Sequence, residues 1–254
     1  MGDIMRKQFR INEFILNKYI KFKMRFLPGK IENEEYCDYL RRLGLQIGKG
    51  TYFFSPETIT VDTQRPWLLE IGEYCKITKG VVILAHDYSR SVLRRYYGEV
   101  IGEAKKTIIG NNVFLGMNTI VLMGSVIWDN VIVGAGSVVH GKIPSNVVVA
   151  GNPATIICTL EEYLQKRKRA YKYEALECAR MYNEYYGKLP TVEDMNAFFP
   201  LYFERDCEKL KDSGIQTNLS GDDEEDILLH FMESRPVYEN YDSFLKDVLD
   251  QGSD

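Results

Sequence analysis

One of the three histidines in the sequence, His86, has the surroundings of a general base. It lies in the stretch ILAHDYS, where a regular pattern of aliphatic residues gives way to a long insertion. Histidine can take a proton from a hydroxyl near neutral pH because its side chain titrates close to that range. The carboxylate of Asp87 could orient the ring, although adjacent residues on a strand point to opposite faces. We therefore predict that His86 is the catalytic residue, against the simpler reading of a surface histidine.

The other histidines and the cysteines give weaker signals. His140 occupies a turn position where polar residues are ordinary, and His230 lies in a helical stretch between Leu229 and Phe231. The five cysteines are scattered without a CxxC pair. This pattern argues against a disulfide framework or a zinc site and fits a reducing cytoplasm, so we expect no metal.

The insertion after His86, about residues 89–108, contains side chains suited to binding a sugar. Aromatic rings can stack on a sugar ring, and guanidinium groups can bond its hydroxyls or a carboxylate. Long loops on rigid scaffolds often carry function. We predict that Asp87, Tyr88 and Arg94 contact a substrate, while packing of the loop against a neighbouring chain explains the same residues equally well.

The elements that position these residues follow a period of six. Between residues 109 and 139 a large aliphatic side chain recurs every six positions, and a small or β-branched one follows four positions after most of them. This is the period of hexapeptide β-helices, in which each hexad is a short strand and a turn, and three hexads make one triangular coil. The aliphatic positions are Ile109, Leu115, Val121, Ile127, Val133 and Val139, and their partners are Val113, Thr119, Ser125, Val131 and Ser137.

The same frame extends back before His86 and is interrupted once, at Arg65. About fifteen hexads predict roughly five coils of a left-handed parallel β-helix, a mainly β fold. We expect Cys75 to fill a corner, and glycines that follow inward residues (Gly110, Gly116 and Gly134) to adopt positive φ. The earlier aliphatic and aromatic positions are Ile47, Phe53, Ile59, Ile71, Ile77 and Ile83, with partners Thr51, Thr63, Cys75 and Val81.

Helical patterns flank the repeat, so we divide the chain into 1–43, 44–158 and 159–254. Residues 1–43 suggest two helices broken at Pro28 and Gly29. The first is basic on one side and aromatic on the other. A cap over the open end of the β-helix is the favoured explanation, and contact with a membrane surface is the alternative. The aromatic positions are Phe9, Phe14, Tyr19, Phe22 and Phe26.

Composition excludes several classes of protein. The 254-residue chain has a formal net charge of −4, which gives no global case for nucleic-acid binding. Charges run through the first 26 residues, so they are neither a signal peptide nor a transmembrane span. We expect a soluble cytoplasmic protein.

The stretch from Ile109 to Ile157 resembles the closing coils of the hexapeptide-repeat acyltransferases. It reads IGNNVFLGMNTIVLMGSVIWDNVIVGAGSVVHGKIPSNVVVAGNPATII, and its GAGSVV…IP…VVAGNPA ending is specific to that superfamily. The ILAHDYS stretch, followed by a loop, is most similar to the sugar and capsular-polysaccharide O-acetyltransferases. The resemblance covers about residues 45–158 and does not name the acceptor.

This resemblance implies a homotrimer in which acetyl-CoA lies in a groove between two β-helices and His86 is the general base. Two glycines would let the pantetheine arm approach the backbone. The family often has threonine-lysine after SVV, whereas here the basic residue comes one place later. The positions that match donor contacts are Gly116, Met117, Gly134, Ala135 and Lys142.

Other functions stay open at this point. The acceptor could be an antibiotic hydroxyl or an amino-sugar amine instead of a saccharide hydroxyl, and a nonenzymatic scaffold would need no base at all. A γ-type carbonic anhydrase has the same coils but needs three histidines around zinc, and only His86 and His140 fall in the repeat.

Overall fold

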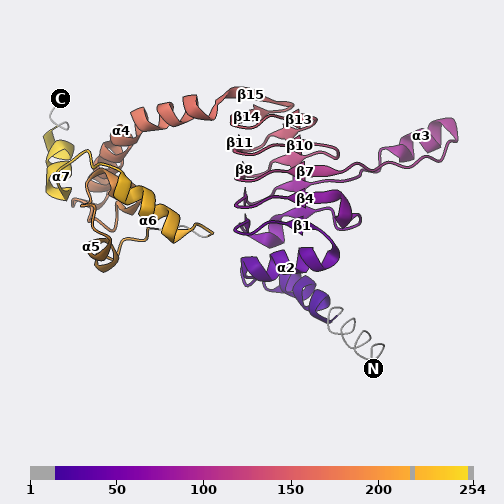
Figure 1. Cartoon of the computed structure of the whole chain (residues 1–254), viewed down its shortest axis with the longest axis horizontal. Helices are drawn as coiled ribbons and strands as arrows, with labels where there is room; N and C mark the ends of the chain where they lie inside the picture. The colour runs from indigo at the N-terminus through magenta and orange to yellow at the C-terminus, as the bar shows by residue number, and fades with distance from the viewer. Residues whose placement is uncertain (1–14, 218–220, 251–254) are drawn as a thin grey trace. The chain divides into compact units, whose positions relative to one another are not determined.

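A computed structural model describes residues 15–217 and 221–250 of the chain (Figure 1). The chain divides into two compact units, Met1–Glu161 and Glu162–Asp254. Short strands dominate the first unit, and helices make up the second.

The strands of the first unit form three sheets, and consecutive strands usually lie in different sheets (Figure 1). Each strand pairs in parallel with the strand one coil away, except that β14 and β15 pair antiparallel. The chain therefore winds as a parallel β-helix with triangular coils. The β1 sheet contains β1 (Gln46–Ile47), β4 (Leu69–Ile71), β7 (Thr107–Ile109), β10 (Val126–Ile127) and β13 (Lys142–Ile143). The β2 sheet contains β2 (Tyr52–Phe53), β5 (Lys76–Ile77), β8 (Val113–Leu115), β11 (Val131–Val133), β14 (Val147–Gly151) and β15 (Ala154–Thr159). The β3 sheet contains β3 (Thr60–Val61), β6 (Val82–Ile83), β9 (Ile120–Val121) and β12 (Val138–Val139).

The six-residue frame correctly predicts the interior of the coils. All six aliphatic side chains predicted between Ile109 and Val139 are at most 1% exposed. The small polar partners are buried too, and their hydroxyls bond backbone carbonyls, as Ser125 Oγ does to Val139 O at 3.1 Å and Ser137 Oγ to Gly134 O at 2.6 Å. A corner residue thus has to be small and to satisfy its own hydrogen bond. Thr63 departs from the frame, since it is exposed.

The first coils are longer than three hexads. Gln46 aligns with Glu70, 24 residues later, and Thr60 aligns with Val82, 22 residues later. The regular spacing of 18 begins only with the pairing of Ile108 and Val126. The extra residues form two 3-10 turns, η1 (Pro56–Thr58) and η2 (Pro66–Leu68), and the second of these follows the interruption at Arg65. Uniform coils of three hexads were therefore the wrong assumption for this part of the chain.

Our expectation of positive φ at Gly110, Gly116 and Gly134 is also wrong. The left-handed positions fall two residues later, at Asn112 (φ 53°), Asn118 (φ 60°) and Gly136 (φ 69°). Stacking explains the glycines instead, because a Cβ on Gly116 would lie 2.6 Å from the backbone nitrogen of Ala135 in the next coil. These glycines allow the coils to approach one another.

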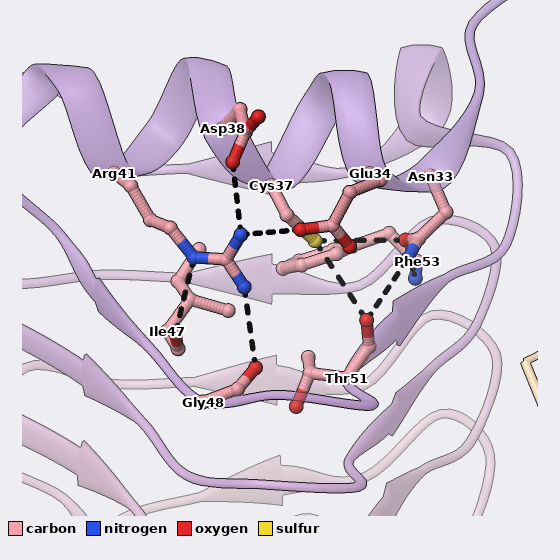
Figure 2. Close-up of polar contacts among 9 residues, drawn as sticks. All are labelled: Asn33, Glu34, Cys37, Asp38, Arg41, Ile47, Gly48, Thr51 and Phe53. Atoms are coloured by element: carbon pink, nitrogen blue, oxygen red, sulfur yellow. Dashed lines mark hydrogen bonds and ion pairs between the residues drawn. The ribbon is translucent and has the colours of Figure 1, made fainter.

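Helix α2 (Asn33–Leu43) closes the first coil with side chains that bond its backbone (Figure 2). Asn33 donates to Thr51 O at 3.0 Å and accepts from Phe53 N at 2.8 Å. Arg41 donates to the carbonyls of Ile47 and Gly48, at 3.2 and 3.4 Å. The open end of a β-helix exposes unpaired strand groups, and these side chains supply their partners.

Residues 15–26 form a second helix at this end. Ile20 is fully buried in the core of the β-helix, Met24 packs against that core, and Lys23 forms an ion pair of 2.7 Å with Glu35 of α2. One side of this helix therefore belongs to the cap. Phe9 and Phe14, which we assigned to its aromatic side, lie outside the described residues.

Replacing Asn33 by alanine should lower the free energy of unfolding by about 1–3 kcal/mol. The change leaves the Phe53 N–H and the Thr51 carbonyl without their present partners. Thermal unfolding measures the effect. Asn33→Asp is the matched comparison, because it keeps the acceptor for Phe53 and loses only the donor, so its loss should be smaller. A melting temperature unchanged in Asn33→Ala would contradict this account of the cap.

The second unit has an apolar core of its own, which includes Leu176, Phe199, Leu210 and Phe244. Two of its helices begin at aspartates, Asp206 and Asp223, whose carboxylates accept from the backbone N–H groups two and three residues on. Its elements are α4 (Leu160–Tyr186), η3 (Asn196–Leu201), α5 (Cys207–Asp212), α6 (Glu224–Glu233) and α7 (Tyr241–Asp250), with α4 beginning two residues before the unit boundary. Among the described residues of either unit, no helix is long and apolar enough to cross a membrane.

Candidate active site

His86 lies at a corner of the β-helix, three residues after β6, and its ring is bonded to Asp62. The ring Nδ1 forms a hydrogen bond with Oδ2 of this carboxylate, which directly follows β3. Strands β3 and β6 pair in register, and this pairing brings the two residues together across adjacent coils. The side chain of Asp62 is 3% exposed and that of His86 is 17% exposed. A buried carboxylate thus holds a histidine that is still open to a ligand.

The surroundings of Asp62 keep it ionised. Burial raises the pKa of this carboxyl, but the hydrogen bond from His86 and the backbone N–H groups of Gln64 and Ala85 lower it, and the net pKa is below the ordinary value. The two backbone bonds measure 3.0 and 3.1 Å. An anionic acceptor at Nδ1 favours the tautomer protonated there. That tautomer leaves Nε2 of His86 as the basic nitrogen.

Asp87 does not orient the His86 ring, so our interpretation of it as the orienting carboxylate is wrong. Its carboxylate accepts from the backbone N–H and the hydroxyl of Ser89, at 2.9 and 2.7 Å. These two bonds lower the pKa of Asp87, which is exposed at the start of the loop. Its predicted role in binding the acceptor stays a prediction.

The loop after His86 extends from the β-helix as an arm. Its base is joined by the bond from Lys105 N to Ala85 O at 3.0 Å, and helix α3 (Arg90–Tyr97) has no buried residue. Figure 1 shows α3 at the far end of this arm. Tyr88 is exposed beneath the Arg90 guanidinium, 5.1 Å from its ring centroid, and Arg94 is exposed on α3. Within one chain the arm carries Arg94 away from the coils.

Four of the residues predicted to contact acetyl-CoA lie together at one corner of the β-helix. The pairing of Leu115 with Val133 places Gly116 and Met117 beside Gly134 and Ala135 in the next coil. The missing Cβ atoms of the two glycines allow neighbouring coils to stack, and their predicted contact with a pantetheine arm stays a prediction. Met117 and Ala135 are exposed, Gly134 is half-buried and Gly116 is buried.

Lys142 lies on the other side of the β3 sheet. It begins β13, two residues after His140, and is exposed at the corner where the chain leaves the β3 sheet. His86 occupies the same corner two coils away, after β6. An extended chain from Ala135 to His140 spans about 17 Å. A small reacting group therefore cannot reach from the edge of the β3 sheet at Ala135 to the edge at His86. A long ligand or a second chain can.

An open groove of about 370 Å³ lies between the helix of residues 15–26, α2 and β3. Its walls carry the cations Lys21 and Arg25 and the hydroxyls of Tyr39, Thr60 and Thr63. Thr63, the residue after Asp62 in the sequence, lines the groove, whereas Asp62 and His86 do not. No cluster of three metal-ligating side chains is found in the described part of the chain.

The sequence has well-defined relatives, although no family model matches it. It is 43% identical to Protein CapG of Staphylococcus aureus over 129 residues, which are 51% of this chain and 74% of CapG. It is 34% identical to the putative acetyltransferase YvoF of Bacillus subtilis over 140 residues, 55% of this chain and 73% of YvoF. It is 49% identical to the galactoside O-acetyltransferase of Escherichia coli over 127 residues, 50% of this chain and 59% of that enzyme.

The relatives and the fold agree. The parallel coils with helical flanks confirm the predicted fold class, a left-handed parallel β-helix, and the relatives confirm the resemblance stated from the sequence. The chain is thus an acyltransferase that belongs to the hexapeptide-repeat acetyltransferase family.

Proposed function

We propose that this protein transfers an acetyl group from acetyl-CoA to a hydroxyl of a saccharide, with His86 as the general base. The observation that carries the proposal is the bond between His86 and the buried, ionised Asp62. A ring held in this way presents Nε2 to an incoming hydroxyl, which is the geometry that general-base catalysis requires. The similarity to a galactoside O-acetyltransferase supports a sugar as the acceptor.

In the proposed step, Nε2 of His86 takes the proton of the acceptor hydroxyl while the hydroxyl oxygen attacks the thioester carbonyl. A carbon–oxygen bond forms, and the carbon–sulfur bond then breaks. The CoA thiolate takes the proton from His86 and leaves as the free thiol, so the ring returns to its starting state. Asp62 stabilises the imidazolium that exists between these two proton transfers.

We propose that the working form is a homotrimer with each site shared by two chains. Helix α3 supports this, because an isolated eight-residue helix is unstable in water and α3 buries none of its residues within its own chain. Val92, Leu93 and Tyr96 are exposed on it and could pack against a neighbouring chain. Cyclic symmetry would close such a contact, and the neighbour's exposed Met117 and Ala135 could then face His86 along the donor groove.

The acceptor would lie between the arm and the groove that Thr63 lines. Asp87, Tyr88 and Arg94 are the proposed contacts on the arm. The groove offers cations and hydroxyls to a saccharide larger than one sugar, and Lys142 is the proposed contact for a phosphate of the donor. We place the reaction in the cytoplasm, where the free thiols of the chain would persist.

Calorimetric titration with acetyl-CoA, followed by an acceptor screen with free thiol as the readout, tests this proposal. We expect about one donor per chain and release of thiol only when a saccharide is added. Release with an antibiotic or amine acceptor, and not with sugars, would change the acceptor class. A chain that binds no acetyl-CoA at high concentration would contradict the proposal and favour a scaffold.

A further inference from the structure

The helix of residues 15–26 has an exposed apolar stripe (Ile15, Tyr19, Phe22 and Phe26). These four side chains are 59%, 49%, 50% and 58% exposed. They are spaced by four, three and four residues, so they lie along one face of the helix. Fully buried Ile20 points to the other side, where the helix packs on the core of the β-helix. The cap therefore accounts for one face of this helix, and among the described residues of the first unit the stripe stays exposed.

Positive charges lie beside the stripe. At 100° per residue, Lys18 and Arg25 lie along one flank, and Lys23, which is paired with Glu35, lies along the other. The guanidinium of Arg25 lies 5.3 Å from the ring centroid of Phe26, and the ammonium of Lys23 lies 5.3 Å from that of Tyr19. The sequence has no acidic residue between positions 15 and 31. A locally cationic stretch of this kind is unusual in a chain whose net charge is −4.

We infer that this helix docks the enzyme on an anionic lipid surface. A helix with aromatic residues on one face and Lys or Arg beside them lies in the plane of a membrane interface, with its apolar face among the headgroups. Adjacent anionic headgroups attract the flanking cations. The charge pattern favours this occupant over the same stripe of a second copy, because that contact would bring the cations of the two helices together. The inference does not depend on the acetyl-transfer assignment, because none of the four stripe residues lines the groove proposed for the acceptor.

The opposite face of the helix stays on the β-helix during docking. Ile20, Met24 and the ion pair between Lys23 and Glu35 hold it there, so binding needs no unfolding of the cap. The two phenylalanine rings lie 5.0 Å apart and form the most continuous part of the stripe. They are the natural position for a substitution that weakens insertion without touching the core.

Sedimentation of the full-length protein with vesicles tests the inference. We expect binding to phosphatidylcholine vesicles that contain about a third phosphatidylglycerol, much weaker binding to phosphatidylcholine alone, and loss of binding as salt screens the charges. The double variant Phe22→Ser, Phe26→Ser should bind the anionic vesicles at least about ten-fold more weakly. Tyr185→Ser, Tyr186→Ser is the matched control, since these two α4 side chains are 82% and 59% exposed, and it should bind like the wild type.

Three results would overturn the inference. The wild type could fail to bind anionic vesicles, or the phenylalanine variant could bind them as the wild type does. Dissociation of the oligomer by the same variant, in light scattering without any vesicle binding, would show that another copy covers the stripe. Transfer to a water-soluble acceptor should be unchanged in the phenylalanine variant, which confirms that it is folded and separates this test from that of the proposed reaction.

Discussion

Replacing His86 by alanine should lower kcat by about 10²- to 10⁴-fold while leaving the affinity for acetyl-CoA almost unchanged. The expected loss is that of general-base assistance, because the acceptor hydroxyl then has to lose its proton without Nε2. The donor groove proposed between two chains does not use the imidazole for binding. Thiol release under saturating acceptor measures kcat, and calorimetry measures the affinity for acetyl-CoA.

His230→Ala is the matched control for this variant. His230 lies in α6 with carboxylates at 3.2 Å (Glu233) and 3.3 Å (Asp226), so it too is a histidine beside acidic groups. It is exposed and far from β6 in the sequence, and its removal should leave kcat unchanged. Equal turnover in His86→Ala and the wild type would remove His86 from the mechanism.

Asp62→Asn should lower kcat nearly as much as His86→Ala does, by about 10²- to 10⁴-fold. The carboxylate accepts from the His86 ring and from the N–H groups of Gln64 and Ala85. An amide in its place has only one acceptor oxygen and adds an N–H donor. If that donor faces Nδ1, the ring proton moves to Nε2, and the basic nitrogen then points away from the acceptor.

The pH dependence separates this effect from simple disruption of the fold. Because Asp62→Asn removes the anion that stabilises the imidazolium formed during the reaction, the pH–rate profile of this variant should differ from that of the wild type. Asp226→Asn removes a carboxylate beside the exposed His230 and should leave the profile unchanged. An unaltered profile in Asp62→Asn, together with unaltered kcat, would show that the pair in the structure plays no part in the reaction.

The stability difference between Asp62→Asn and the wild type should also depend on pH. The pKa of Asp62 is lowered on folding, so its ionised form stabilises the native state above the ordinary value of about 3.9. This contribution is lost as the pH falls through the lowered pKa. The variant lacks it, so the difference in melting temperature between Asp62→Asn and the wild type should shrink in strong acid.

Burial along the coils was readable from the sequence because the repeat is local. In the regular coils, a side chain six positions after an inward residue returns to the interior, as Leu115 and Val121 show. His86 could be singled out for the same reason, since it stands where this local pattern stops. The sugar acetyltransferase resemblance likewise rested on contiguous residues.

The partner of His86 could not be found in this way. Asp62 lies 24 positions earlier, and coils of 18 residues would have stacked a different residue beside the histidine. The 3-10 turns that lengthen the first coil depend on how Pro56 and Pro66 fit the corners, which the hexad pattern does not report. The direction of the arm and the stacking role of Gly116 are likewise properties of adjacent coils.

The sequence by itself therefore determined the fold, the family and the candidate base, because each depends on residues that are near one another in the chain. Only the tertiary structure decided which carboxylate holds that base, since coil length sets which residues meet across neighbouring coils. It also decided that the N-terminal helix caps the β-helix with one face and exposes an aromatic stripe on the other. The sequence had offered cap and membrane contact as alternatives, and the two faces of one helix have room for both.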